Sequence, residues 1–248
     1  MKIAQKVIIL FLIIFVISLY ILINEFVEYK VSDDSNSELI EKVITNEGKE
    51  EKMDIQWEKI KNINQDIIGW IKIEDTNINY PILKDNNSLK YLKYTHDGKY
   101  NKNGSIFTLD EDPFNERITT IHGHNMKNGL MFSELSKYMS EKFFKEHSTF
   151  YIYTEKQNYK ATIFSCYSIN VNTEENNIKW LDSDGEIEYY KNISKYPVED
   201  IGQIDKIVKL STCSYLDNTT SPTSQRYFIV AKIENEEKTA ENIDFSWD

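Results

Sequence analysis

Three side chains that could together attack a peptide carbonyl group lie at the ends of predicted strands. Cys213 ends the apolar run "DKIVKLSTC", His124 follows the segment "ITTI" within "IHGHNM", and Arg226 begins "RYFIVAKI". A cysteine nucleophile requires a thiolate, an imidazole that exchanges protons with it, and donors for the oxyanion that forms at the attacked carbonyl. Because neighbouring strands of a barrel can bring their ends together, these three residues form a candidate catalytic set.

The other histidines have less support as catalytic groups. His96 and His147 lie in polar contexts, where we expect solvated side chains. For His122 we expect a strand-end packing residue that lines the site without doing chemistry. No third ligand accompanies His122 and His124, so we expect no metal site. We also expect no cofactor.

The N-terminus predicts a membrane anchor. Lys2 and Lys6 precede an uncharged run from Val7 to Ile23, which as a helix would rise about 26 Å, nearly the thickness of a hydrocarbon core. A cleaved signal peptide would end in a small-residue site, and none follows this run. With the lysines before the span, the positive-inside rule places the N-terminus in the cytoplasm and the rest of the chain outside.

The charge balance excludes one class of partner. The chain has 29 Lys and Arg against 40 Asp and Glu, a formal net charge of −11. A protein of this sign is not expected to bind nucleic acid.

The elements that must position the candidate residues are mostly short strands. Runs such as "WIKIEDTNINYPIL", "YKATIFSCYSI" and "RYFIVAKI" are separated by turn-rich pieces such as "DGKYNKNG". Helices are expected over residues 57–68, ending before Gly69, and at two interruptions, 129–147 and 185–196. Many short strands with few helices indicate a closed or nearly closed β-barrel with peripheral helices.

The expected organisation follows the chain in order. It comprises a cytoplasmic segment (1–6), a transmembrane helix (7–24), an extracellular stalk (25–55), one catalytic domain (56–235) and an acidic tail (236–248).

The second cysteine leaves a structural alternative open. Cys166 lies in "IFSCYSI", and a Cys166–Cys213 disulfide is possible outside the membrane. That alternative describes a membrane-tethered binding domain without a reactive thiol. Against it, "IFSCYSI" alternates like a strand in which Cys166 is an ordinary buried residue.

The segments "IHGHNM", "GLMF", "KLSTCSY" and "QRYFIVAKI", in this order, resemble the signature of sortases, and of class B in particular. The resemblance runs from about Trp57 to Ile233. It implies an eight-stranded sortase-type barrel preceded by N-terminal helices, with an extra helix before the cysteine strand. It also implies roles: Cys213 as the nucleophile, His124 as general acid and base, and Arg226 steadying the substrate carbonyl and oxyanion.

The resemblance further implies a transpeptidation at the outer face of a Gram-positive membrane. The thiolate would attack a threonine carbonyl within a C-terminal sorting motif of a secreted protein. The resulting thioacyl enzyme would pass its acyl group to an amine of a peptidoglycan precursor or cross-bridge, or to a pilin lysine. Residues expected to border the substrate are Ser211, Thr212, His122 and Leu92.

The chain departs from the family pattern at several positions near the site. Lys209 stands where threonine is usual, His122 stands where an aromatic is more usual, and Tyr215 replaces an acid found in some class B members. Another cell-wall cysteine peptidase remains an alternative. An L,D-transpeptidase would show glycine immediately before its cysteine, which "STC" lacks.

Overall fold

The computed structural model describes residues 2–47, 53–86, 88–214 and 224–236, and eight of its strands close into a barrel. Tyr215, most of the interval between Cys213 and Arg226, and the tail from residue 237 lie outside the described residues. The barrel strands are β3 (Ile67–Lys72), β4 (Asn79–Lys84), β5 (Ile106–Thr108), β6 (Ile118–His122), β7 (Thr149–Tyr153), β8 (Asn158–Asn170), β9 (Ile207–Cys213) and β10 (Gln225–Asn235). Their order around the barrel is β10-β8-β7-β3-β4-β5-β6-β9, with β9 pairing again to β10. The predicted eight-stranded barrel is confirmed.

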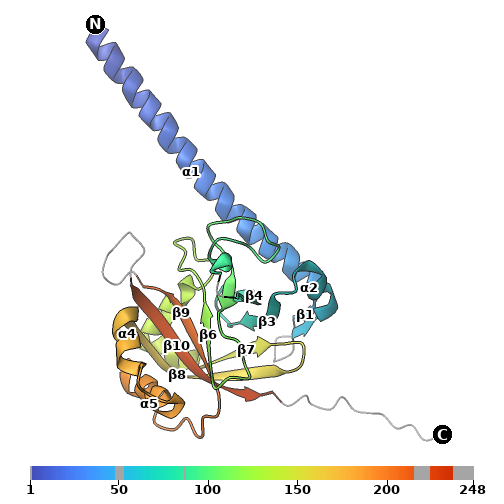
Figure 1. Cartoon of the computed structure of the whole chain (residues 1–248). Coiled ribbons are helices and arrows are strands. Elements are labelled where there is room, and N and C mark those ends of the chain that lie inside the picture. Colours follow the sequence, from blue (N-terminus) through green and yellow to red (C-terminus); the bar gives the residue numbers. More distant parts are fainter. Residues whose placement is uncertain (1, 48–52, 87, 215–223, 237–248) are drawn as a thin grey trace, which may run out of the picture.

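Smaller elements surround the barrel (Figure 1). They are α1 (Lys2–Val43), β1 (Ile44–Glu47), β2 (Met53–Ile55), α2 (Trp57–Ile63), η1 (Lys90–Leu92), η2 (Ser133–Met139), α3 (Glu141–Glu146), α4 (Val171–Ile178) and α5 (Ser183–Ile193). The short hairpin of β1 and β2 forms a separate two-stranded sheet.

The direction of the strands brings three strand ends to one edge of the barrel. β6 and β9 run parallel, so both finish at the same edge. β10 is antiparallel to β9 and therefore begins there. The candidate residues at the end of β6, the end of β9 and the start of β10 thus meet at this edge.

The N-terminal helix α1 is continuous from the apolar segment into the folded domain. Within the described residues, it is the one helix long and apolar enough to cross a membrane, with a mean hydropathy of 3.1 over its most apolar window. Residues 25–43, the first part of the expected stalk, continue this helix without a break. Leu39 and Val43, near its end, are buried against the domain and pack in a cluster with Ile60 and Trp70. Figure 1 shows the rest of α1 projecting away from the barrel.

The helix predicted over residues 57–68 is wrong in its C-terminal part. α2 ends at Ile63, and Asn64 already has an extended backbone. Ile67 begins β3, pairs with Leu83 of β4 and is fully buried. The pairing partner on β4 therefore overrides the helical spacing of the isoleucines.

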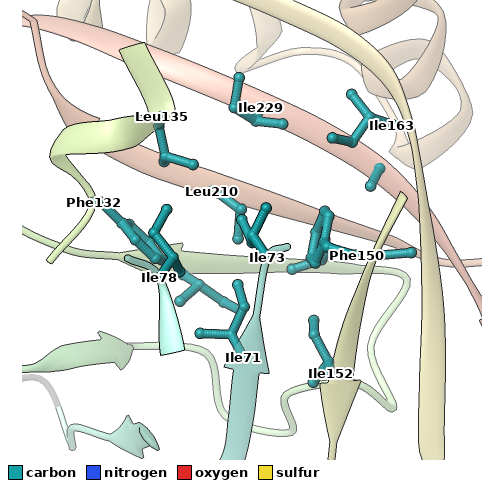
Figure 2. Packing of buried hydrophobic residues seen from close by; sticks show 14 of the residues in the cluster. Ile71, Ile73, Ile78, Phe132, Leu135, Phe150, Ile152, Ile163, Leu210 and Ile229 are labelled. Carbon is teal, nitrogen blue, oxygen red and sulfur yellow. The ribbon is translucent and has the colours of Figure 1, made fainter. Parts of the chain in front are cut away.

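The core fills the barrel interior. One face of β9 points into this core and the other points outward. Figure 2 shows Ile71, Phe150, Ile163, Leu210 and Ile229 converging from different strands, with Phe132 and Leu135 closing over them. Because successive side chains of a strand point to opposite faces, the inward set on β9 includes Val208 and Leu210. The outward set is Ile207, Lys209, Ser211 and Cys213.

Helices α4 and α5 lie on the outer face of β8, β9 and β10 (Figure 1). α5 buries Ile187 and Tyr190 there, in a cluster with Tyr167, Ile207 and Phe228. The helix predicted over residues 185–196 is present as α5, which begins at Ser183 and already ends at Ile193, whereas α4 was not predicted. The predicted helical interruption at 129–147 forms η2 followed by α3.

Candidate functional site

Cys213 is the last residue of β9 and carries a free, partly buried thiol. Cys166 is also free and is fully buried, with its Sγ donating to the carbonyl oxygen of Tyr138 at 3.4 Å. Cys166 belongs to the barrel core, whereas Cys213 lies on the outward-facing set of β9. The alternative of a Cys166–Cys213 disulfide is therefore wrong, because the barrel wall separates the two thiols.

The two thiols also differ in chemical character. Burial raises the pKa of Cys166 to about 12. Since the thiolate is the nucleophilic form, Cys166 is inert at neutral pH. Of the two cysteines, Cys213 is the one placed to react.

Arg226 lies directly opposite Cys213 in the antiparallel ladder between β9 and β10. Residues directly opposite one another share a face of the sheet, with Cβ atoms about 4.5–5.5 Å apart. The ladder continues past them, where the amide of Ser214 donates to the carbonyl oxygen of Gln225 at 2.9 Å. The sheet therefore places Arg226 and Cys213 side by side on one face, and Nη1 of Arg226 donates to the carbonyl oxygen of Gln225 at 3.0 Å.

His124 follows the end of β6 in a loop that is held against β9. The amide of Gly123 donates to the carbonyl oxygen of Ser211 at 3.1 Å, and Phe132 donates to the carbonyl oxygen of His124 at 2.9 Å. A Cβ at Gly123 would lie 2.4 Å from Cδ1 of Ile106 and 2.7 Å from Cδ2 of Phe132. Glycine is therefore what allows the loop to leave the strand so close to the core.

The imidazole of His124 is oriented by the backbone of η1. Its Nε2 lies 2.8 Å from the carbonyl oxygen of Leu92. A carbonyl oxygen only accepts hydrogen bonds, so Nε2 carries the proton in this contact. In the neutral imidazole, Nδ1 is then the nitrogen that can accept a proton.

Asn125 is a site residue that the sequence did not predict. Its side-chain amide donates to the carbonyl oxygen of Cys213 at 2.6 Å. This bond joins the loop that carries the imidazole to the residue that carries the thiol. The only signal in the sequence is its position directly after His124.

His122 lies on the same outer face as the thiol. It pairs with Ser211 across the parallel β6–β9 ladder, and its ring lies 5.5 Å from that of Phe107. Burial and then the positive charges of Lys209 and Arg226 lower the pKa of His122 to about 4. The imidazole of His122 is therefore neutral at physiological pH.

Of the four residues expected to border a substrate, two lie on the same outer face as Cys213 and two do not. His122 and Ser211 face outward with Cys213 and Arg226, and we call these four outward positions the catalytic face. Leu92 meets the site through its carbonyl group. The side chain of Thr212 is 2% exposed and, one position from Cys213, points to the opposite side of β9.

The acidic and histidine side chains do not gather into a ligand set. Within the described ranges, no group of three His, Cys, Asp or Glu side chains could hold a metal ion.

Comparisons with known proteins converge on one family. A family model described as the sortase domain matches residues 71–234. A protein named sortase B from Listeria monocytogenes is 31% identical over 160 residues, which are 62% of this chain and 65% of that protein. Sortase B of Staphylococcus aureus is 28% identical over 187 residues, 72% of this chain and 74% of that protein. The match thus spans slightly less than two thirds of the Listeria protein.

The fold agrees with these sequence matches. The crystal structure of Clostridium perfringens sortase B superposes with a TM-score of 0.65 at 28% identity, covering 72% of this chain and 100% of that one. The residues that the family model matches, 71–234, include the strand ends that carry Cys213 and Arg226.

Proposed function

Since this chain belongs to the sortase family, class B, we propose that it is a membrane-anchored transpeptidase acting on secreted proteins. Members of the family are cysteine transpeptidases. The proposed substrate is a C-terminal sorting motif, cleaved after threonine. The proposed acceptor is an amine of a peptidoglycan precursor or cross-bridge, or a pilin lysine. The observation that carries the proposal is the direct pairing of Cys213 with Arg226.

The first half of the reaction forms a thioester. The thiolate of Cys213 attacks the threonine carbonyl carbon, and the guanidinium of Arg226 stabilises the negative charge that develops on the oxygen. His124 gives a proton to the departing amine nitrogen, the peptide C–N bond breaks, and the acyl group stays on sulfur.

The second half reverses these roles. An acceptor amine attacks the thioester carbon, His124 takes the proton that the amine loses, and the Cys213 thiolate leaves. The product contains a new amide bond, and the enzyme returns to its starting state.

On the catalytic face, the partly exposed His122 presents a neutral imidazole beside the ring of Phe107. Ser211, its partner across the β6–β9 ladder, is only 6% exposed. The carbonyl oxygen of Leu92 accepts the hydrogen bond that orients the His124 imidazole. Thr212 belongs to β9 directly before Cys213 and has a buried side chain. We assign His122 to substrate contact, and Ser211, Leu92 and Thr212 to support of the site.

The proposed location is the outer face of the cell membrane, with residues 1–6 in the cytoplasm and 7–24 in the bilayer. The exposed apolar surface of α1, and Lys2 and Lys6 in its first turns before the apolar run, support this topology. The catalytic domain, from residue 56 to 235, would then lie outside. Because α1 is continuous as far as Val43, the segment from residue 25 would connect the two parts as a helix.

The alternative of a hydrolytic cell-wall cysteine peptidase uses the same three residues. It differs in the acceptor, which would be water instead of an amine. Product analysis with and without an added amine therefore separates the two functions.

The test uses the full chain in detergent with a panel of fluorogenic sorting-type peptides. Cleavage after threonine is expected in the unmodified protein. It should be abolished in Cys213→Ala and reduced roughly 10³-fold in His124→Ala and 10²- to 10³-fold in Arg226→Ala. Cys166→Ala is the matched control and should retain activity. Equal activity in Cys213→Ala would refute the proposal.

A further inference from the structure

A buried lysine lies on β9 four residues before the nucleophile. Lys209 is 6% exposed although it points outward, in line with Ser211 and Cys213. It departs from the threonine that the family resemblance implies at this position. A buried ammonium group requires a partner, because desolvation of an unpaired charge is costly.

The partner is Glu174 on α4. The Nζ of Lys209 lies 3.0 Å from Oε2 of Glu174, and their side chains are 8% and 3% exposed. The hydroxyl of Tyr167 donates to Oε1 of the same carboxylate at 2.5 Å. The rings of Tyr190 and Phe228 complete the surroundings, with centroids 4.9 and 4.5 Å from the Lys209 Nζ. Both charges are therefore enclosed and satisfied.

This ion pair is the main buried attachment of α4. The sequence of the helix, "VNTEENNI", is polar, and Glu174 is its one buried residue. A surface helix normally attaches through an apolar stripe, which α4 lacks. Its place on the barrel therefore depends on a charged contact with β9.

The helix also begins next to the catalytic face. The amide of Val171 donates to the carbonyl oxygen of Ser224 at 2.9 Å, and Asn170 pairs with Gln225. Arg226 follows directly and pairs with both Cys213 and Ile169. From this end α4 runs back over the outer face of the sheet to Lys209, beside Ser211.

We propose that Lys209 and Glu174 are positioning residues that hold α4 as a wall beside the catalytic face, against which a bound sorting peptide packs. The inference rests on the proposed function and deepens it. Neither residue touches the reacting atoms. Their loss should weaken peptide binding more than it slows the chemical step.

The experiment measures KM and kcat separately for a cleaved peptide, using the full chain in detergent. Glu174→Gln keeps the shape of the side chain and removes its charge, whereas Lys209→Met removes the cation. Each should raise KM roughly tenfold with kcat changed less than about threefold, as expected for lost binding shared by ground and transition states. Lys209→Arg keeps the charge and should recover most of the loss seen in Lys209→Met.

A matched control removes an ion pair of the next helix along the chain. Asp184, at the start of α5, pairs with Arg117 at an exposed position. Asp184→Asn should leave KM within about twofold. If Glu174→Gln or Lys209→Met fails to fold, Tyr167→Phe tests the same anchor by removing only the hydroxyl bonded to Glu174, with an expected rise in KM of about threefold.

A substrate-free readout separates this inference from the proposed function. Amide hydrogen exchange of residues 171–178 should accelerate in Glu174→Gln and stay unchanged in Asp184→Asn. Unmodified protein that cleaves no peptide would contradict the proposed function, whatever the exchange shows. If the unmodified protein cleaves the peptide, an unchanged KM in folded Glu174→Gln would overturn the proposed role of the Lys209–Glu174 ion pair. Unchanged amide hydrogen exchange of α4 in that variant would overturn it as well.

Discussion

The side-chain amide of Asn125 donates a hydrogen bond of 2.6 Å to the carbonyl oxygen of Cys213. It connects two segments 88 residues apart, the loop after β6 and the end of β9. The imidazole of His124 is one residue from one end of this bond, and the thiol belongs to the residue at the other. The distance between the proposed acid–base group and the proposed nucleophile should therefore depend on Asn125, which takes no part in the proposed proton transfer.

Asn125→Ala should therefore lower kcat/KM roughly tenfold while the protein remains folded. Small displacements of catalytic groups are costly, since about 1 Å can reduce the rate 10²-fold. Steady-state cleavage of a sorting peptide measures the effect. Asn128→Ser, in the same loop, keeps a short acceptor for the amide of Leu130 and should change the rate less than about twofold. Equal rates in Asn125→Ala and Asn128→Ser would contradict the role of the bond.

Gly123→Ala should destabilise the fold. The new methyl group would lie 2.4 Å from Ile106 and 2.7 Å from Phe132, both buried. Overpacking of this kind costs about 1–3 kcal/mol and should lower Tm by roughly 2–10 °C. Thermal unfolding followed by circular dichroism measures the shift. Gly98→Asn is the control, because Gly98 has a positive φ that asparagine tolerates and no atom within 4 Å of an added Cβ. A Tm within 1 °C of the unmodified protein would contradict the predicted clash, because the loop after β6 would then accommodate the methyl group without loss of stability.

His122 should make the stability depend on pH. Its pKa is about 4 in the folded protein and 6.5 in a free side chain. Between these values the unfolded chain binds more protons, so stability falls as pH falls through this window. From pH 7 to pH 5 the loss from this residue is roughly 1–2 kcal/mol. Urea unfolding at both pH values measures it.

Two variants separate this contribution from that of other groups. His122→Phe keeps an aromatic ring next to Phe107 and should reduce the pH dependence by about that amount. His147→Gln, at a histidine directly after α3 that contacts Asp75, should retain the pH dependence. An unchanged pH dependence in His122→Phe would show that His122 is not the group responsible.

The two thiols should react at very different rates in the folded protein. Cys166 is fully buried with a pKa of about 12, whereas Cys213 is partly exposed at a strand end. Iodoacetamide at pH 7.5 should modify Cys213 at least roughly 10²-fold faster. Peptide mass spectrometry measures both sites, and unfolding in urea should make the rates similar. Comparable labelling in the folded state would place Cys166 outside the core.

The strand ends were predictable because they follow from local patterns. Apolar runs ending at His122 and Cys213, and one beginning near Arg226, identify positions at the edge of a sheet. The free state of Cys213 was not predictable from spacing, because it depends on which side of the barrel wall each cysteine faces. That side depends on the register of β8 against β10, which sequence periodicity leaves open.

The missed features are contacts between distant segments. Asn125 has no chemistry that marks it, and its importance comes from the carbonyl group that it reaches. Helix α4 has no apolar stripe, so its pattern resembles a loop, and its attachment is a carboxylate that meets Lys209 35 residues later. The helical spacing of Ile67 and Ile68 was misleading because pairing with β4 outweighs it.

The most direct test of the central claim is the intact mass of the full chain after brief incubation with a sorting peptide. The proposed mechanism predicts added mass equal to the peptide fragment up to and including threonine, attached to Cys213 and discharged by an added amine as a new peptide product. Cys213→Ala should acquire no such mass. Turnover without any adduct on Cys213, or equal product from Cys213→Ala, would contradict a thioacyl intermediate at this residue.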